Sequence, residues 1–261
     1  MGERGGVTMA SVPAMLLALI TLASPAEACG AAALGEGRVV AIDGTRTLRL
    51  GDGRTIRLAG IEWVASPETA RAALTGMALG RTVILKGTAT PDRYGRIHAF
   101  PSVNGSATPI QYALLDRGLA VTGIRIGDTA CRDALLSRER AARIARQGPG
   151  LGIGSAGDYR LHQADDPAAI LTSLGRFAIV EGRVLSVRES GSTVYVNFGR
   201  RWSEDFTVTI AKRTEADFIA AGLPPLSLTG RMVRVRGVIE DRAGPWIEAT
   251  AADQFDWDGR P

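Results

Sequence analysis

Short apolar runs broken by glycine-containing turns dominate the first half of the chain, and they predict strands. The segments Thr47–Leu50 and Thr55–Leu58 flank the turn 51–54, which reads GDGR and indicates a hairpin. Further strands are expected at Gly37–Ile42, Thr82–Lys86 and Arg96–Phe100. Apolar positions at helical spacing predict helices at Pro67–Gly76, Pro109–Arg117 and Ala130–Gln147. Strands followed by helices indicate an α+β fold.

The second half of the chain is nearly all β by the same reasoning. Strands are expected at Ala178–Val187, Thr193–Phe198, Phe206–Ile210, Val233–Val238 and Trp246–Ala249, with a helix at Thr214–Ala221. Strict alternation in the second of these strands predicts that Val194, Val196 and Phe198 face the core. Five strands with one helix fit a small oligonucleotide/oligosaccharide-binding (OB) barrel or another small sheet.

The N-terminus carries an apolar run, Val12–Leu22, that is too short to span a bilayer. It is followed by Ala26-Glu27-Ala28, which has the small-residue pattern of a signal-peptide cleavage site. We therefore expect residues 1–28 to be a signal peptide and the protein to be exported, periplasmic or secreted. No stable membrane insertion is expected after its removal. A lipid anchor on Cys29 is the alternative.

Charge divides the remaining chain unevenly. Residues 29–157 hold 17 Arg and Lys against 10 Asp and Glu, a net charge of +7, whereas residues 175–261 hold 12 of each sign. The Gly/Pro-rich segment 148–158 and the acidic residues after it predict a linker at 158–174. The expected domains are therefore 29–157 and 175–261, and the first should attract an anionic partner such as nucleic acid.

Two cysteines are too few for a disulfide-dense scaffold. In an oxidising compartment Cys29 and Cys131 can pair, closing a loop of about 100 residues. Two unpaired thiols are the alternative.

Four stretches occur in a recognisable order. They are AIDGTRTLRL (41–50), TIRLAGIEWVASPE (55–68), DRYGR (92–96) and QYALLDRGLA (111–120). Over residues 35–147 they resemble the thermonuclease family, whose fold is staphylococcal-nuclease-like. The resemblance implies an OB-type five-stranded barrel with helices, and Ca²⁺-assisted hydrolysis of phosphodiester bonds in DNA or RNA. Residues 175–250, with GRRWSEDFTV at 199–208, resemble a C-terminal extension found in some exported bacterial relatives.

The resemblance assigns the phosphate-binding half of the site. Arg57, in I-R-L, and Arg96, in D-R-Y-G-R, match the two arginines that stabilise charge on the phosphate. Arg93 and Tyr94 are expected to contact substrate. Each arginine has an alternative role as a surface ion-pair partner.

The metal-and-water half of the family's site is altered. Asp43 and Glu62 match metal-ligand positions, but Thr45-Arg46 stand where a further ligating Asp is expected. If Arg46 takes that place, a calcium site loses an oxygen and gains repulsion. The general-base position meets Ala65, so Glu68 is the candidate base, with a role in the first turn of a helix as the alternative.

Three hypotheses for function follow. The first is an exported calcium-dependent nuclease. The second is an inactive nuclease fold that binds nucleic acid or another polyanion. The third is an envelope interaction module in which the second half does the work. In that half, four aromatic residues beside Arg200 and Arg201 either form a stacking platform for bases or pack in the core: Tyr195, Trp202, Phe206 and Trp246.

Overall fold

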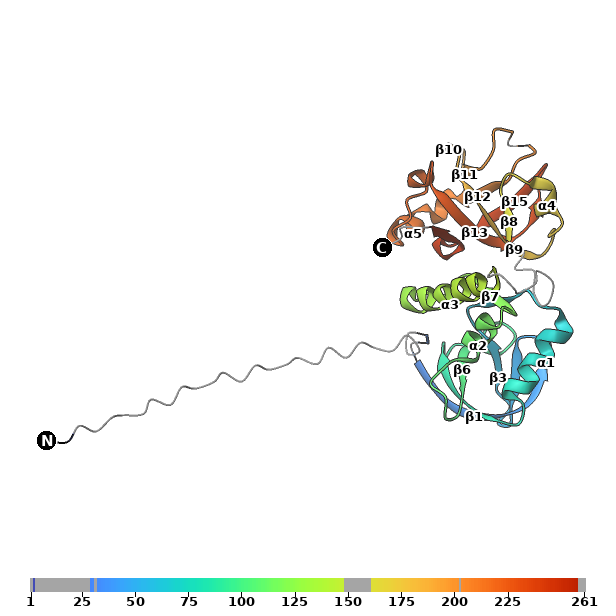
Figure 1. Ribbon diagram of the computed structural model, residues 1–261, viewed down its shortest axis with the longest axis vertical. Coiled ribbons are helices and arrows are strands. Elements are labelled where there is room, and N and C mark those ends of the chain that lie inside the picture. The colour runs from blue at the N-terminus through green and yellow to red at the C-terminus, as the bar shows by residue number, and fades with distance from the viewer. Residues whose placement is uncertain (1, 3–28, 31, 148–160, 202, 258–261) are drawn as a thin grey trace.

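The computed structural model describes residues 2, 29–30, 32–147, 161–201 and 203–257, and it is strand-rich and α+β, as expected (Figure 1). Apart from Gly2, the expected signal peptide lies outside the described residues, as do residues 148–160 of the Gly/Pro-rich segment. No helix in the described part of the chain is long and apolar enough to cross a membrane.

Five strands of the first half form a closed sheet in the order β1-β2-β3-β6-β5. Their bounds are β1 Ala32–Asp43, β2 Thr47–Leu50, β3 Thr55–Leu58, β5 Thr82–Gly87 and β6 Arg96–Val103. All neighbours are antiparallel except β3 and β6, which run parallel. Alternate side chains of β2 and β3 point inward, so Leu48, Leu50, Ile56 and Leu58 are buried. The hairpin expected from the sequence is confirmed.

Closure of this sheet requires a very close approach between β5 and β6. A side chain on Gly87 would place its Cβ 2.3 Å from the carbonyl oxygen of His98 and 2.7 Å from the Cα of Ala99. Gly87 also pairs with Ala32 of β1, so one residue contacts both neighbouring strands. Glycine is the residue that allows this approach.

Three helices and a two-stranded sheet complete the first half. They are α1 Pro67–Ala78, α2 Ile110–Asp116, α3 Thr129–Gln147, β4 Ile61–Trp63 and β7 Ala120–Thr122. Helix α1 begins where Ser66 accepts a hydrogen bond from the Thr69 N–H and Pro67 takes the first helical position. Strands β4 and β7 are antiparallel and were not expected from the sequence, because three-residue strands give too little alternation to read.

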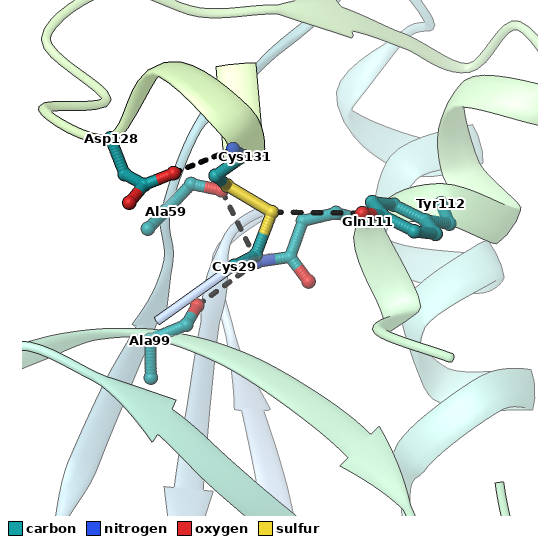
Figure 2. Close-up of a disulfide and its surroundings, with 7 residues drawn as sticks. All are labelled: Cys29, Ala59, Ala99, Gln111, Tyr112, Asp128 and Cys131. Atoms are coloured by element: carbon teal, nitrogen blue, oxygen red, sulfur yellow. Dashed lines mark hydrogen bonds between the residues drawn. A yellow bond between two sulfur atoms is a disulfide. The ribbon is translucent and has the colours of Figure 1, made fainter. Parts of the chain in front are cut away.

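A disulfide between Cys29 and Cys131 ties the start of the described chain to α3, which confirms one of the two alternatives for the cysteines (Figure 2). The Tyr112 hydroxyl contacts Cys29 Sγ at 3.7 Å, and both sulfurs are buried. Closing a loop of this length restricts the unfolded chain by about 4–5 kcal/mol in the chain-entropy model. Since Cys29 Sγ is bonded to Cys131, it is not available for a lipid thioether.

Gln111, beside this disulfide, joins α2 to the closed sheet. Its side-chain amide donates hydrogen bonds to the carbonyls of Ala59 and Ala99, at 3.1 and 2.9 Å (Figure 2). Ala59 follows β3 and Ala99 lies in β6, so the buried Gln111 side chain links the two parallel strands through hydrogen bonds.

The second half contains two sheets around one core. The five-stranded sheet has the order β10-β11-β12-β15-β14, and the four-stranded sheet has the order β16-β13-β9-β8. The bounds are β8 Leu161–Gln163, β9 Phe177–Arg183, β10 Ser186–Ser190, β11 Thr193–Asn197, β12 Thr207–Ala211, β13 Met232–Val238, β14 Glu240–Asp241, β15 Pro245–Ala249 and β16 Phe255–Trp257. Within residues 161–201 and 203–257, two α-helices and three 3-10 turns accompany them: α4 Pro167–Leu171, α5 Glu215–Ala220, η2 Lys212–Thr214, η3 Pro225–Leu228 and η4 Ala252–Gln254.

One expected strand of this half is wrong. Ala178–Val187 is not continuous, because the chain leaves the four-stranded sheet after Arg183 and enters the five-stranded sheet at Ser186. The backbone of Val184 bonds instead to Gly230 and Arg231. The alternation in β11 is confirmed: Val194 and Val196 are fully buried and Phe198 packs against the same core.

The described part of the expected linker, 158–174, is ordered secondary structure. Strand β8 pairs in parallel with β9 and so belongs to the four-stranded sheet. Helix α4 begins at Pro167 because the Asp166 carboxylate accepts a hydrogen bond from the Ala169 N–H. One of the acidic residues of the expected linker, Asp166, therefore caps a helix.

A buried ion pair joins the two halves. Figure 1 shows α3 lying between the closed sheet and the sheets of the second half. Glu139 on α3 and Arg236 on β13 are each 1% exposed, with Arg236 Nη1 3.0 Å from Glu139 Oε2. Arg236 Nη1 also donates a hydrogen bond to the Thr122 carbonyl. The backbone N–H of Thr122 in turn donates to Glu139 Oε2 at 2.7 Å. Strands β7 and β13 are thus connected through one carboxylate.

Further contacts surround this pair. Arg132 reaches Asp253 at 3.4 Å and Arg140 reaches Asp256 at 2.5 Å. A small apolar cluster of Val64, Val121 and Ile179 also spans the two halves. Part of the positive charge of the first half is therefore neutralised by carboxylates of the second half.

Glu139→Ala should lower the free energy of unfolding by about 3–5 kcal/mol, because it leaves the Arg236 guanidinium buried without its carboxylate. Urea denaturation measures the change. Glu139 also pairs with the buried Arg143, at 3.4 Å, so the control is the triple variant Glu139→Leu, Arg143→Met and Arg236→Met. It should unfold near the wild-type midpoint, since no buried partner of Glu139 is left alone. A loss below about 1 kcal/mol in the single variant would contradict this account.

The same pair predicts a pH dependence. Burial alone would raise the pKa of Glu139, but the charge and hydrogen bonds of Arg236 and the Thr122 N–H lower it below its ordinary value. A lowered carboxyl pKa stabilises the fold above the unfolded pKa, about 4.3, and this stabilisation is lost as the pH falls through the folded value. Glu139→Gln should therefore show a flatter stability profile than wild type below about pH 4.

Candidate anion-binding site

The parallel pair β3 and β6 brings three basic side chains to one face of the closed sheet. In the register, Arg57 lies opposite His98 and Thr55 lies opposite Arg96. Alternate residues of a strand share a face, so Arg57, Arg96 and His98 project together while Ile56 points into the core. All three are partly exposed.

Arg46 joins this group from the turn between β1 and β2. The carbonyl of Arg46 accepts the Leu58 N–H, which fixes the turn against the end of β3. The Arg46 guanidinium lies 2.5 Å from the carboxylate of Glu62 on β4 and also donates to the Ile61 carbonyl at 3.3 Å. The side chains of Arg46 and Glu62 are 23% and 30% exposed, so the pair is partly shielded from water.

Within this cluster, Arg57 is the arginine whose guanidinium N–H groups have no partner among the described residues. Among residues 32–147, 161–201 and 203–257, none forms a hydrogen bond or ion pair with its guanidinium. Partial burial and the nearby positive charges of Arg46 and Arg96 lower the pKa of Arg57, and the carboxylates of Glu62 and Asp92 oppose this shift only in part. A guanidinium stays protonated under such a shift. Its environment therefore favours an incoming anion.

Asp92 is shared between Arg96 and His98. Its Oδ2 accepts from Arg96 Nε at 2.9 Å and lies 3.2 Å from His98 Nε2, while its Oδ1 caps the turn through the N–H groups of Tyr94 and Arg96. The Arg96 guanidinium, with these hydrogen bonds, holds the pKa of Asp92 well below its usual range. Asp92 is therefore a fixed negative charge that orients two members of the cluster.

Tyr94 stands at the edge of the cluster and is 64% exposed. The guanidinium carbons of Arg93 and Arg96 each lie 4.8 Å from the centroid of its ring. Because both guanidiniums lie over the ring, a nucleic-acid base stacks on Tyr94 by displacing one of them.

Neither of the other two expected site residues, Asp43 and Glu68, pairs with a described member of this cluster, although the strand register places Asp43 on the same face as Arg57, through Thr47. Asp43 is exposed and lies 3.5 Å from Arg49, at the end of β1. Glu68 is exposed in the first turn of α1, where its own backbone N–H and the Ser66 hydroxyl lower its pKa. A lowered pKa suits the helix terminus and weakens Glu68 as a proton acceptor.

These residues do not fit a calcium ion. Calcium takes six to eight oxygen ligands, mostly from carboxylates and carbonyls. Within the described residues, no three His, Cys, Asp or Glu side chains gather in a way that could hold a metal. Glu62, the best-placed carboxylate, is already paired with Arg46, and the guanidinium of Arg57 also lies near it.

Two features of the cluster were missed by sequence reasoning. His98 is not among the residues that the motifs assign, although it stands two positions after Arg96 and therefore shares its face on a strand. Asp92 was read only as part of the DRYGR motif. In the second half, Phe206 is fully buried, and Trp246 is 8% exposed with its Nε1 donating a hydrogen bond to the Thr209 hydroxyl, so both pack in the core. Trp202 lies outside the described residues.

Comparison with known proteins gives no relative: no protein-family model matches the chain, and no curated protein sequence matches it. The likeness to the thermonuclease family therefore rests on the motifs quoted above.

The Arg46–Glu62 pair predicts how the protein responds to calcium. Calcium at about 10 mM should leave the wild-type thermal midpoint unchanged, because a guanidinium occupies the carboxylate. Arg46→Asp places two carboxylates together and should gain calcium-dependent stability of about 2–3 kcal/mol if the ion binds with Kd near 10⁻⁴ M. Differential scanning fluorimetry with calcium or chelator measures both. An equal rise in the two proteins would contradict the account.

Proposed function

We propose that this protein binds the phosphate backbone of nucleic acid through Arg46, Arg57 and Arg96, and that binding needs no calcium. One observation supports this above the others: the Arg57 guanidinium stands between two further arginines without an ion-pair partner of its own. Planar guanidiniums match phosphate oxygens with paired, charge-assisted hydrogen bonds.

The local charge agrees with this role. Three guanidiniums face the two carboxylates of Glu62 and Asp92, which leaves one excess positive charge before His98 is counted. A phosphodiester carries one negative charge, so one bound phosphate would neutralise the excess positive charge of the site. The remaining basic residues of the first half that are not paired with the second half add long-range attraction.

The position of Tyr94 favours a single strand over a duplex. Its ring is exposed beside Arg93 and Arg96, so a phosphate on the arginines can be followed by a base on the ring. Only unpaired bases offer their faces to such a ring.

The wider proposal concerns fold and location. We propose that the closed sheet is an OB-type barrel of a divergent thermonuclease-like domain, and the order of motifs supports this. Export is supported by the N-terminal pattern and by the disulfide, which persists in oxidising compartments.

Hydrolysis of the bound phosphodiester with calcium is the competing proposal. Arg57 and Arg96 are retained for it, and Arg46 and Ala65 stand against it. A binding assay that also follows the length of the oligonucleotide separates the two.

Binding is tested with fluorescein-labelled single-stranded DNA and RNA in chelator, by anisotropy over a series of salt concentrations. Arg57→Ala should weaken binding about tenfold or more and reduce the salt slope by about 1, since one phosphate contact is lost. Arg71→Ala removes an equal charge from the exposed face of α1 and is the matched control, expected near wild-type affinity.

Equal losses in the two variants would show that the attraction is diffuse and that Arg57 forms no site. Cleavage that appears only with calcium would favour the competing proposal. Failure of wild type to bind either nucleic acid at low salt would exclude both.

A further inference from the structure

We propose that the same site cleaves RNA without a metal, with His98 as the residue that takes and returns a proton. This proposal rests on the proposed function, because the arginines must first hold the phosphate. It adds an activity that neither the family resemblance nor the calcium hypothesis contains.

The geometry puts an imidazole beside the bound phosphate. His98 is the register partner of Arg57 across the parallel pair, and it is two residues from Arg96 on the same face. Its side chain is 44% exposed, so a ligand can reach it. A phosphate held between Arg57 and Arg96 therefore has His98 as its neighbour on the strand.

Asp92 fixes the form of this imidazole. Its carboxylate remains ionised beside Arg96 and can only accept a hydrogen bond, so Nε2 of His98 carries the proton in the 3.2 Å contact. The lone pair of a neutral imidazole then resides on Nδ1. A carboxylate that holds one imidazole nitrogen and leaves the other free to accept a proton is the arrangement used in general-base catalysis.

The reaction that fits is internal transfer of the phosphoryl group. Nδ1 of His98 takes the proton of a ribose 2′-hydroxyl, and the 2′-oxygen forms a bond to phosphorus while the bond to the 5′-oxygen breaks. The leaving oxygen takes a proton from water, and the hydroxide so formed takes the proton back from His98. The products are a 2′,3′-cyclic phosphate and a 5′-hydroxyl, with no oxidant or metal involved.

The arginines supply the rest of the catalysis. Negative charge builds on the non-bridging oxygens as the 2′-oxygen attacks, and Arg57 has unused donors to meet it. Because the nucleophile belongs to the substrate, no carboxylate is needed to position water. DNA lacks the 2′-hydroxyl, so it should bind and remain intact.

The test uses the oxidised protein with single-stranded RNA, DNA of the same sequence and 2′-O-methyl RNA, all in excess chelator. Binding is followed by anisotropy and cleavage by electrophoresis, with product ends identified by mass spectrometry. His98→Gln keeps a side chain that can bond Asp92 but cannot transfer a proton. His162→Gln, in β8, changes the other histidine and is the matched control.

The expected result is that wild type and His162→Gln cut RNA alone, giving cyclic phosphate ends, and that His98→Gln cuts at least about 10²-fold more slowly. RNA that binds but stays uncut overturns this proposal and leaves the proposed function standing, whereas absence of binding overturns both. Equal cleavage by His98→Gln, or cleavage of 2′-O-methyl RNA, would also overturn it. The 2′-O-methyl control needs no variant, so it holds even if His98→Gln folds poorly.

Discussion

The Arg46 guanidinium lies 2.5 Å from the Glu62 carboxylate, and the character of the whole surface depends on this contact. With a carboxylate at position 46, Glu62 would belong to an acidic pair that attracts a cation and would oppose a phosphate at Arg57. With arginine there, Glu62 is neutralised and Arg57 and Arg96 are left to face an anion. The residue at position 46 thus sets the sign of the charge beside Glu62 on the outer face of β3 and β6.

The second half acts on this surface only indirectly. Helix α3 is rich in arginine, and its Arg132 and Arg140 reach Asp253 and Asp256 across the boundary between the halves. The Glu139–Arg236 pair acts in the opposite direction, because it neutralises an acidic residue of the first half, so the contacts across the boundary remove little of the net charge of +7 on residues 29–157. Arg57 is therefore distinguished from the other basic residues of the first half by its position near Arg46 and Arg96, and not by the total charge.

Much of the closed sheet could be predicted from the sequence, because β2, β3 and β5 alternate cleanly and are bounded by turn residues. Gly182 and Val184 gave no sign that the chain changes sheets there, since apolar residues continue through the break. Contacts between the two halves could not be predicted from the sequence either, because Arg236, the partner of Glu139, lies 97 residues further along the chain. At the site, the sequence motifs predict Arg57 and Arg96. The contact between Asp92 and His98 could be recognised only in the folded structure, where His98 lies on the same strand face as Arg96. The OB-like character of the second half stays a prediction, since its strands divide between two sheets.

The most direct measurement compares the affinity of single-stranded DNA for wild type, Glu62→Gln and Arg46→Ala in chelator at fixed salt. If the site is built for phosphate, Glu62→Gln binds more tightly because Arg46 is released from its partner. Arg46→Ala binds more weakly, because Glu62 is left uncompensated. Opposite shifts of about threefold to tenfold are expected for a change of one partly screened charge. Unchanged affinity in both variants, or binding by wild type that appears only with calcium and disappears in Glu62→Gln, would contradict the account.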